Sequence, residues 1–189
     1  MDSTDRITEA EYLVRERAAE YRSEYLAGQV RAMTGGSLQH NRIVVNLAVA
    51  LSAQLRDRPC EVCVIDVRVK VSPAGLYTYP DVAVSCGGPI YEDAVTDTLL
   101  NPLVIFEVLS PSTQQYDRGE KFGYYRQIES LREYVLIAQD RTRVEHFARD
   151  LDWAPVTLEA PDSVTELPAI GCALPLGDIY ERVELSPRT

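Results

Sequence analysis

The sequence predicts an α/β (α+β) fold, with a mixed β-sheet of about five or six strands and helices on its faces. Residues 61–71 alternate between apolar and polar side chains, as in a strand with one buried face. Residues 103–109 form an almost continuous apolar run, typical of a strand buried on both faces. Residues 37–56 instead carry apolar side chains at spacings of three and four, which indicates a helix lying on the sheet. Strands and helices in such an order pack as layers around a core.

The N-terminal part predicts a helix, a hairpin and a second helix. Thr8 and Glu11 match a capping box, which opens a charged surface helix ending at about Arg22. Residues 24–34 read as a short hairpin packed on the core, ended by a turn at two glycines. Ser37 is the expected N-cap of the helix that runs to about residue 56.

The middle and end of the chain predict further strands. Residues 61–71 are expected to form one strand and residues 77–86 the next, with Asp81 near the start of the latter. A helix should follow residue 110 and run to about Ile128, although two glycines weaken it. Two last strands, at 132–138 and 142–148, should form a hairpin.

Bulk composition limits the class of protein. With 189 residues and 46% hydrophobic content, the chain suits one domain over residues 1–189, with a helical N-terminal extension over about residues 1–23. We find neither a signal-peptide pattern nor an apolar run long enough for a bilayer, so we expect a cytoplasmic protein without a membrane partner. The formal net charge of -10 argues against broad, non-specific binding to nucleic acid.

The four cysteines are expected to be reduced, because the chain carries no secretion signal. Cys60 and Cys63 have the spacing of half a zinc site, but no second pair follows them. Cys63 is in phase with the inward residues of its predicted strand, which favours a packed thiol.

Glu107 is the one charged residue in the apolar run at 103–109. An ionised Glu in apolar surroundings costs several kcal/mol unless a cation or hydrogen-bond donors compensate it. The position therefore suggests an ion pair or a metal site. The alternative is that Glu107 points to solvent at the strand end, and periodicity does not separate the two.

Asp81 and Glu107 lie on two predicted strands near the centre of the fold, where their carboxylates could bind Mg²⁺. The carbonyl of Val108 could add a third oxygen. Lys121 lies about two turns into the following helix, and its ammonium could stabilise charge on a phosphate beside a metal-activated water. The alternative is that Lys121 is a solvated helix residue paired with Asp117.

Five segments of this central region closely resemble the Uma-two restriction endonuclease family, within the PD-(D/E)XK nuclease superfamily. The resemblance extends from about residue 24 to residue 180. The segments are 79–81 (Tyr-Pro-Asp), 105–113, 116–121, 125–126 and 130–134.

The resemblance implies a restriction-endonuclease-like mixed β-sheet core flanked by helices. It also implies that Asp81 and Glu107 hold Mg²⁺ or Mn²⁺ and that a lysine positions the attacking water. Leu109 stands where the superfamily lysine usually occurs, and Lys121 matches a lysine that has moved into the following helix. The expected activity is metal-dependent hydrolysis of DNA phosphodiester bonds by a homodimer, since two-fold symmetry suits cleavage of both strands.

Further residues are candidates for accessory roles. His40 should lie in the first turn of a helix, where the helix dipole lowers its pKa. By resemblance it is a metal ligand or phosphate contact, and the alternative is a capping or packing histidine. Glu24 is a candidate extra ligand, and Arg118 or Arg126 a candidate phosphate contact. The alternative function is a non-catalytic nucleic-acid-binding or protein-interaction module on a nuclease scaffold, which the acidic composition and Leu109 favour.

Overall fold

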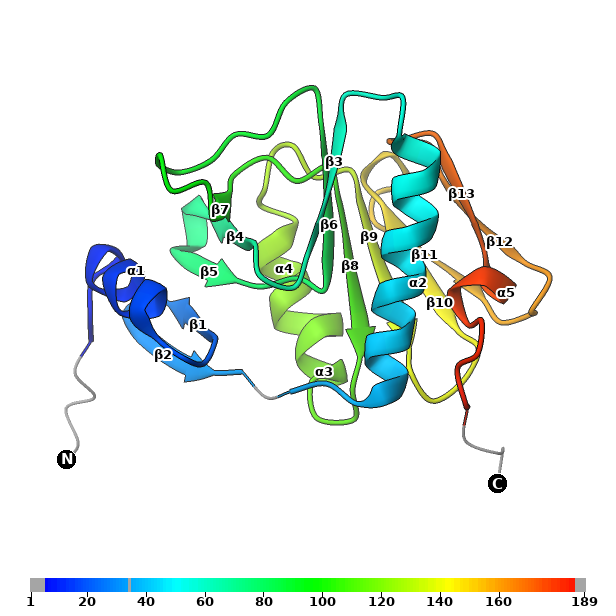
Figure 1. Cartoon of the computed structure of the whole chain (residues 1–189), viewed down its shortest axis with the longest axis horizontal. Helices are drawn as coiled ribbons and strands as arrows, with labels where there is room; N and C mark the ends of the chain where they lie inside the picture. Colours follow the sequence, from blue (N-terminus) through cyan, green and yellow to red (C-terminus); the bar gives the residue numbers. More distant parts are fainter. Residues whose placement is uncertain (1–5, 34, 186–189) are drawn as a thin grey trace.

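The protein is described by a computed structural model that covers residues 6–33 and 35–185, and its centre is a six-stranded mixed sheet (Figure 1). β8 (Val104–Leu109) and β9 (Glu133–Ala138) are parallel, while all other neighbours in this sheet are antiparallel. The predicted class, a mixed sheet with flanking helices, is confirmed. In spatial order the strands are β11 (Pro155–Leu158), β10 (Val144–Ala148), β9 (Glu133–Ala138), β8 (Val104–Leu109), β6 (Val82–Cys86) and β3 (Cys60–Val64).

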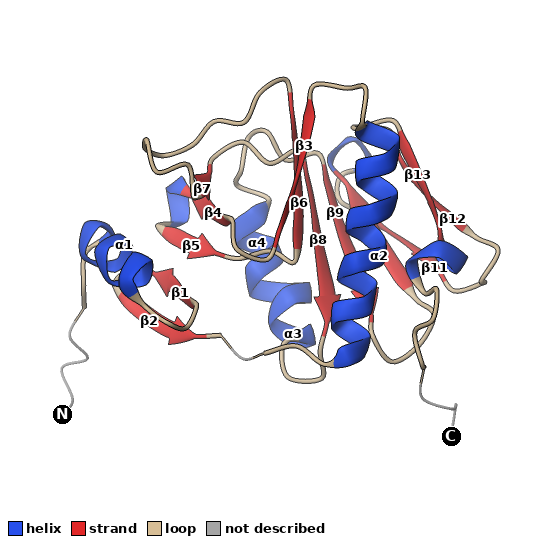
Figure 2. Ribbon diagram, viewed as in Figure 1, coloured by secondary structure: helices blue, strands red, loops and turns tan. Residues whose placement is uncertain are grey.

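A second sheet of five short strands lies beside the first one (Figure 2). A separate pair of strands, β12 (Val164–Leu167) and β13 (Cys172–Pro175), follows near the C-terminal end. In spatial order the five-stranded sheet contains β2 (Gln29–Ala32), β1 (Ser23–Leu26), β5 (Leu76–Thr78), β4 (Arg68–Val71) and β7 (Thr98–Leu99).

Two predicted strands are each divided between these sheets, so the prediction of single strands at 61–71 and 77–86 was wrong. The first breaks at Ile65, whose φ of 58° leaves the extended region. The second breaks after Thr78, and the two bends meet where the Ile65 N–H donates to the Asp81 carbonyl at 3.2 Å. Asp81 therefore lies at a bend, immediately before β6, and not inside a strand.

Helix α2 (Leu38–Leu55) covers one face of the six-stranded sheet, and its N-cap is Ser37 as predicted. Burying an aliphatic side chain such as Leu47 contributes about 1.5–3 kcal/mol. The C-terminal β12–β13 pair and α5 (Leu176–Ile179) complete the core on this face. Across the described part of the chain, no helix combines the length and apolar character needed to cross a membrane. The buried residues of α2 are Ile43, Val44, Leu47, Leu51 and Leu55.

A helical crossover between the parallel strands β8 and β9 packs on the other side of this sheet. Parallel neighbours require such a connection. It consists of α3 (Gln114–Tyr116), the π-helical turn η2 (Asp117–Lys121) and α4 (Phe122–Tyr125). The predicted helix is thus present but contains a π-turn and ends before Ile128.

The N-terminal helix α1 (Glu9–Ala18) begins at the predicted capping box of Thr8 and Glu11. It ends at Ala18, short of the predicted end at Arg22, and it is not a purely surface helix because its Tyr12 is buried against the ring of Tyr25. The predicted hairpin is confirmed as β1 and β2. Its second strand is exposed at all four positions, in contrast to the expected packing on the core.

The expectation that every cysteine is reduced was wrong. Cys60 and Cys86 lie opposite each other on β3 and β6 and form a disulfide, which ties the edge strand to the sheet. Cys63 and Cys172 are free and buried, so the packed thiol predicted for Cys63 is confirmed. Burial raises the pKa of Cys63 to about 11.

Candidate active site

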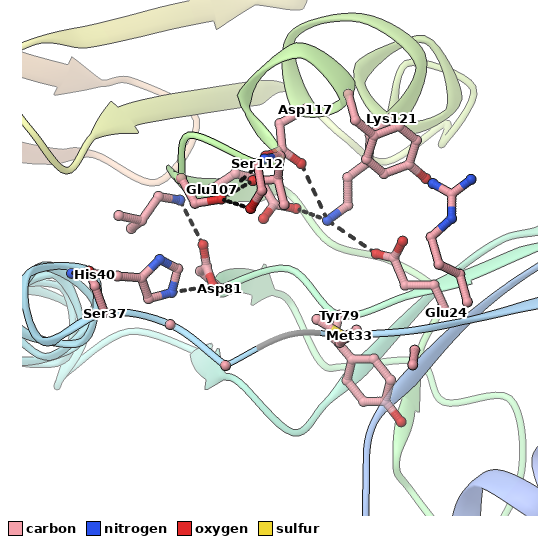
Figure 3. A pocket seen from close by; sticks show the side chains of 18 residues that line it. Glu24, Met33, Ser37, His40, Tyr79, Asp81, Glu107, Ser112, Asp117 and Lys121 are labelled. Carbon is pink, nitrogen blue, oxygen red and sulfur yellow. Dashed lines mark hydrogen bonds and ion pairs between the residues drawn. The ribbon is translucent and has the colours of Figure 1, made fainter.

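A cavity of about 370 Å³ opens where β8 ends (Figure 3). Its walls come from the β1–β2 hairpin, the start of α2, the bend before β6 and the segment from β8 to η2. Residues distant in sequence thus meet in one place. The polar residues that line it include Glu24, Arg31, Ser37, His40, Asp81, Glu107, Ser112, Asp117 and Lys121.

Glu107 and Lys121 form a buried ion pair at the floor of this cavity. Lys121 Nζ lies 2.9 Å from Glu107 Oε1, and the two side chains are only 6% and 5% exposed. The Tyr125 hydroxyl also donates to Glu107 Oε1 at 2.9 Å. The alternatives in which Glu107 or Lys121 points to solvent are therefore wrong.

Two further carboxylates surround the Lys121 ammonium. Glu24 of β1 approaches to 3.3 Å and Asp117 to 3.8 Å. Although burial alone would lower it, these carboxylates and Glu107 raise the pKa of Lys121 well above its ordinary value, so the ammonium stays charged. Burial raises the pKa of Glu107, and repulsion from Asp81 and Asp117 adds to this effect against the attraction of Lys121.

Asp81 is held beside the end of β8 by two contacts. The Val108 N–H donates to Asp81 Oδ2 at 2.7 Å, and His40 Nε2 lies 3.0 Å from Asp81 Oδ1. Burial opposes the charge on His40, but the Asp81 carboxylate dominates and raises the pKa of His40 above its ordinary value. The predicted lowering by the helix dipole was therefore wrong. Nδ1 of His40 is buried and has no hydrogen-bond partner in the described residues.

The residues predicted to hold a metal ion supply hard oxygen ligands from the bend before β6 and from the adjacent strand β8. Asp81 and Glu107 repel each other, which a divalent cation would relieve. Within residues 6–33 and 35–185, no group of three or more His, Cys, Asp or Glu side chains has the arrangement of a metal site. Two carboxylates nevertheless fit Mg²⁺, because this ion usually retains several waters.

Comparison with known proteins identifies the family. A family model described as "Uma2: Putative restriction endonuclease" matches residues 9–177. The chain belongs to the Uma2 family. Two uncharacterized proteins of Synechocystis sp. are similar to it: sll1609 is 40% identical over 80% of this chain and 86% of its own length. The other, slr1290, is 33% identical over 93% of this chain and 92% of its own length.

The fold of this Uma2 protein also matches a crystal structure from Anabaena variabilis. That structure belongs to a protein described as "a putative nuclease belonging to DUF820". The TM-score is 0.75 over 92% of this chain and 97% of the other, at 19% sequence identity. At this identity the likeness establishes a common fold.

The structure does not bring the two predicted phosphate contacts into the cavity. Arg118 instead pairs with Glu145 at 2.8 Å. The Arg126 guanidinium lies over the rings of Phe122 and Trp153. Neither arginine lines the cavity of this Uma2 protein.

Arg31 of β2 lines the cavity, and sequence reasoning missed it. Its guanidinium lies 5.6 Å from the centre of the Tyr116 ring. Nothing in the sequence distinguishes Arg31 from the other arginines, because its position depends on how the hairpin packs.

A polar network fixes the bend that carries Asp81. The Tyr79 hydroxyl donates to Glu16 and accepts from Arg68, both at 2.9 Å. Glu16 and Arg68 are almost fully buried. Thr78, at the end of β5, donates to Glu24 and so helps to aim that carboxylate at Lys121.

Proposed function

We propose that this Uma2 protein is a Mg²⁺- or Mn²⁺-dependent endonuclease that hydrolyses phosphodiester bonds of DNA. The observation that supports it best is the contact between Lys121 and Glu107 at 2.9 Å. The lysine reaches the carboxylate from the crossover helix, so two carboxylates and a lysine gather at the end of β8 even though position 109 is Leu. The family description and the shared fold support the same reaction class.

In this proposal Asp81, Glu107 and the carbonyl of Val108 hold the metal ion. Tyr125 and Lys121 both contact Oε1 of Glu107, so Oε2 is the oxygen that remains for the ion. When bound, the ion would lower the pKa of a water molecule and offset charge on the phosphate.

Lys121 acts as a hydrogen-bond donor in this scheme. Three carboxylates lie around it and favour its charged form, so we assign it the role of a donor and not of the base. A fixed ammonium can instead orient the attacking water and stabilise negative charge that develops on the phosphate. Glu24 and Asp117 hold the ammonium in position from its other sides.

A non-catalytic binding module is the second candidate function, and one feature of the cavity favours it. Lys121 already faces three carboxylates and Asp81 already faces His40, so much of the charge is balanced without a metal ion. This function predicts binding to nucleic acid or to a protein without metal-dependent hydrolysis.

Cleavage of labelled single- and double-stranded DNA and RNA with Mg²⁺ or Mn²⁺ tests the proposal. Asp81→Asn and Lys121→Ala should each abolish metal-dependent cutting. Lys70→Ala is a matched control, because Lys70 also bridges two carboxylates, Glu9 at 2.8 Å and Glu92 at 2.6 Å, outside the cavity. Cutting that survives Asp81→Asn, or is lost equally in Lys70→Ala, would contradict the assigned roles.

Thermal unfolding with and without the divalent ion separates the two functions. An ion that binds only the folded state adds about 2.7 kcal/mol at 100 times its dissociation constant. We expect this stabilisation in the wild type and its loss in Asp81→Asn. Stabilisation without cleavage of any nucleic acid would favour the binding module.

We further propose that the active form is a homodimer, because two-fold symmetry would present two sites to the two strands of a duplex. Sedimentation equilibrium of the full chain tests the assembly. A monomer that still cuts both strands would contradict the dimer but not the chemistry.

A further inference from the structure

The outer strand of the β1–β2 hairpin is exposed in a way that the fold does not explain. All four residues of β2 are exposed, and Val30 is 49% exposed. Met33, which follows the strand, is 39% exposed. Apolar residues in a strand usually pack on a core, so a strand that buries none of them adds little to stability. The end of the strand and the residue after it instead form a wall of the cavity, through Arg31, Ala32 and Met33.

Arg31 is the cation of this wall, and it differs from Lys121 in its partners. Lys121 is nearly buried and faces three carboxylates. Arg31 is exposed, and in the described part of the chain no carboxylate forms an ion pair with it. Its contact is the Tyr116 ring, 5.6 Å away. An arginine stacked on an aromatic face keeps its N–H donors available in a planar, fixed arrangement.

We propose that the β1–β2 hairpin is a substrate-binding arm, in which Arg31 binds a backbone phosphate next to the one that is cleaved and Tyr116 positions the guanidinium. This inference rests on the proposed nuclease function and assigns the hairpin a role within it. The guanidinium matches a phosphate through two parallel hydrogen bonds, which a lysine cannot supply.

The charge of the cavity explains why such a residue is needed. Four carboxylates line the cavity, and Lys121 already forms ion pairs with three of them. The whole chain carries a formal net charge of -10, so a polyanion would be repelled. Arg31 is an exposed cation opposite Glu24 in the hairpin and offsets this repulsion where the nucleic-acid strand approaches. The four carboxylates are those of Glu24, Asp81, Glu107 and Asp117.

Binding of a labelled oligonucleotide to the full chain without a divalent ion, so that it is not cut, titrated over a range of salt concentrations, tests the arm. Each phosphate contact contributes a slope of about -0.7 (single strands) to -0.9 (duplex) to log K against log salt. We expect Arg31→Ala to weaken binding roughly tenfold and to make the slope shallower by about one such contact. In cleavage assays the variant should raise KM with kcat nearly unchanged.

Two comparisons make the test specific. Arg56→Ala removes an exposed arginine just after α2, outside the cavity, and should leave affinity and slope at wild-type values. Tyr116→Phe keeps the ring and should bind like the wild type, whereas Tyr116→Leu should weaken binding in the same direction as Arg31→Ala.

The outcomes separate this inference from the proposed function. Wild-type affinity, slope and KM in Arg31→Ala would overturn the arm while leaving the nuclease proposal intact. Cleavage lost in Asp81→Asn together with weakened binding in Arg31→Ala would support both. A wild type that takes up Mg²⁺ but neither binds nor cuts any oligonucleotide would overturn both.

Discussion

At the scale of single residues, the buried pair of Glu107 and Lys121 is the feature on which both stability and the proposed function depend. Removing one partner of a buried ion pair leaves an uncompensated charge and costs about 3–5 kcal/mol. We therefore expect Lys121→Met to lower the free energy of unfolding by this amount, measured by urea denaturation at neutral pH. The double variant with Glu107→Gln should recover part of the lost free energy of unfolding, because position 107 then carries no charge that needs a partner.

A double-mutant cycle supplies the control for this prediction. The coupling energy between positions 107 and 121 should be large and favourable. If the effects of Lys121→Met and Glu107→Gln simply add, the two side chains do not interact in solution as they do in the structure.

The residues of the site differ in how far the sequence could predict them. Glu107 stands out because it is charged within an apolar run, and its need for a partner predicted an ion pair or a metal site. Lys121 could be predicted from its place in the next helix together with the family resemblance. Arg31 could not be predicted, because an exposed arginine on a hairpin has no local pattern that indicates where the hairpin packs.

At the scale of elements, the glycines of the hairpin and of the crossover helix should respond in opposite ways to alanine. Gly123 lies in α4, and a Cβ added there would meet nothing within 4 Å. Gly123→Ala should stabilise the protein by roughly 0.5–1 kcal/mol through helix propensity. Gly28 has φ +96°, and a Cβ there would lie 2.9 Å from the Arg6 Cβ, so Gly28→Ala should destabilise.

Urea denaturation of both variants checks this contrast. Equal effects of the same sign would mean that one of the two backbone conformations differs from the structure.

The edge strand β3 carries a second prediction, on the state of the cysteines. The native protein should show no thiol that reacts with a small reagent, because Cys63 and Cys172 are buried and Cys60 is joined to Cys86. Unfolding without reductant should expose two thiols, and unfolding with reductant four. Counting labelled thiols by mass spectrometry checks both numbers.

Loss of this disulfide should also lower stability. The bridge closes a loop with a sequence separation of 26 residues, for which the loop-entropy relation gives about 3–4 kcal/mol. Cys60→Ser and Cys86→Ser should lose similar amounts. Four reactive thiols in the unreduced, unfolded protein would contradict the bridge.

The same elements show why the fold was predictable in class but not in detail. The alternation of apolar residues along 61–71 continues across Ile65, so no change of pattern marks the point where the chain turns from one sheet to the other. Cys60 and Cys86 are partners through strand register, which the spacing of cysteines does not reveal. The capping box at Thr8 and the N-cap at Ser37, in contrast, are local signals and were correctly placed.

At the scale of the whole molecule, an ion-pair network joins α1 to the second sheet and should determine acid stability. Asp97 accepts hydrogen bonds from Arg17 and forms an ion pair with Arg68, and these guanidinium groups, Arg17 first, hold the pKa of Asp97 below its ordinary value of 3.8. A carboxyl whose pKa is lowered by folding stabilises the protein above its unfolded pKa. This contribution is lost as the pH falls through the lower, folded pKa.

We therefore expect Asp97→Asn to be less stable than the wild type at pH 7, by about 1.5–3 kcal/mol, the range for hydrogen bonds to charged groups. The difference should shrink as the pH falls below 3.8. Asp140→Asn is the control, since Asp140 is 54% exposed and pairs with its neighbour Arg141. Thermal unfolding between pH 2 and pH 7 checks the trend, and a constant difference across this range would contradict it.

The position of the lysine on the crossover, not on β8, affects how this protein can change in evolution. All six residues of β8 are buried, and Leu109 belongs to the apolar cluster around Tyr125. Position 109 is therefore constrained mainly by packing, and position 121 mainly by charge. In a nuclease whose lysine stands on the strand, one residue must satisfy both constraints. In this protein Leu109 meets the packing constraint and Lys121 meets the charge constraint. Substitutions that repack the core at position 109 therefore need not alter the Lys121 ammonium.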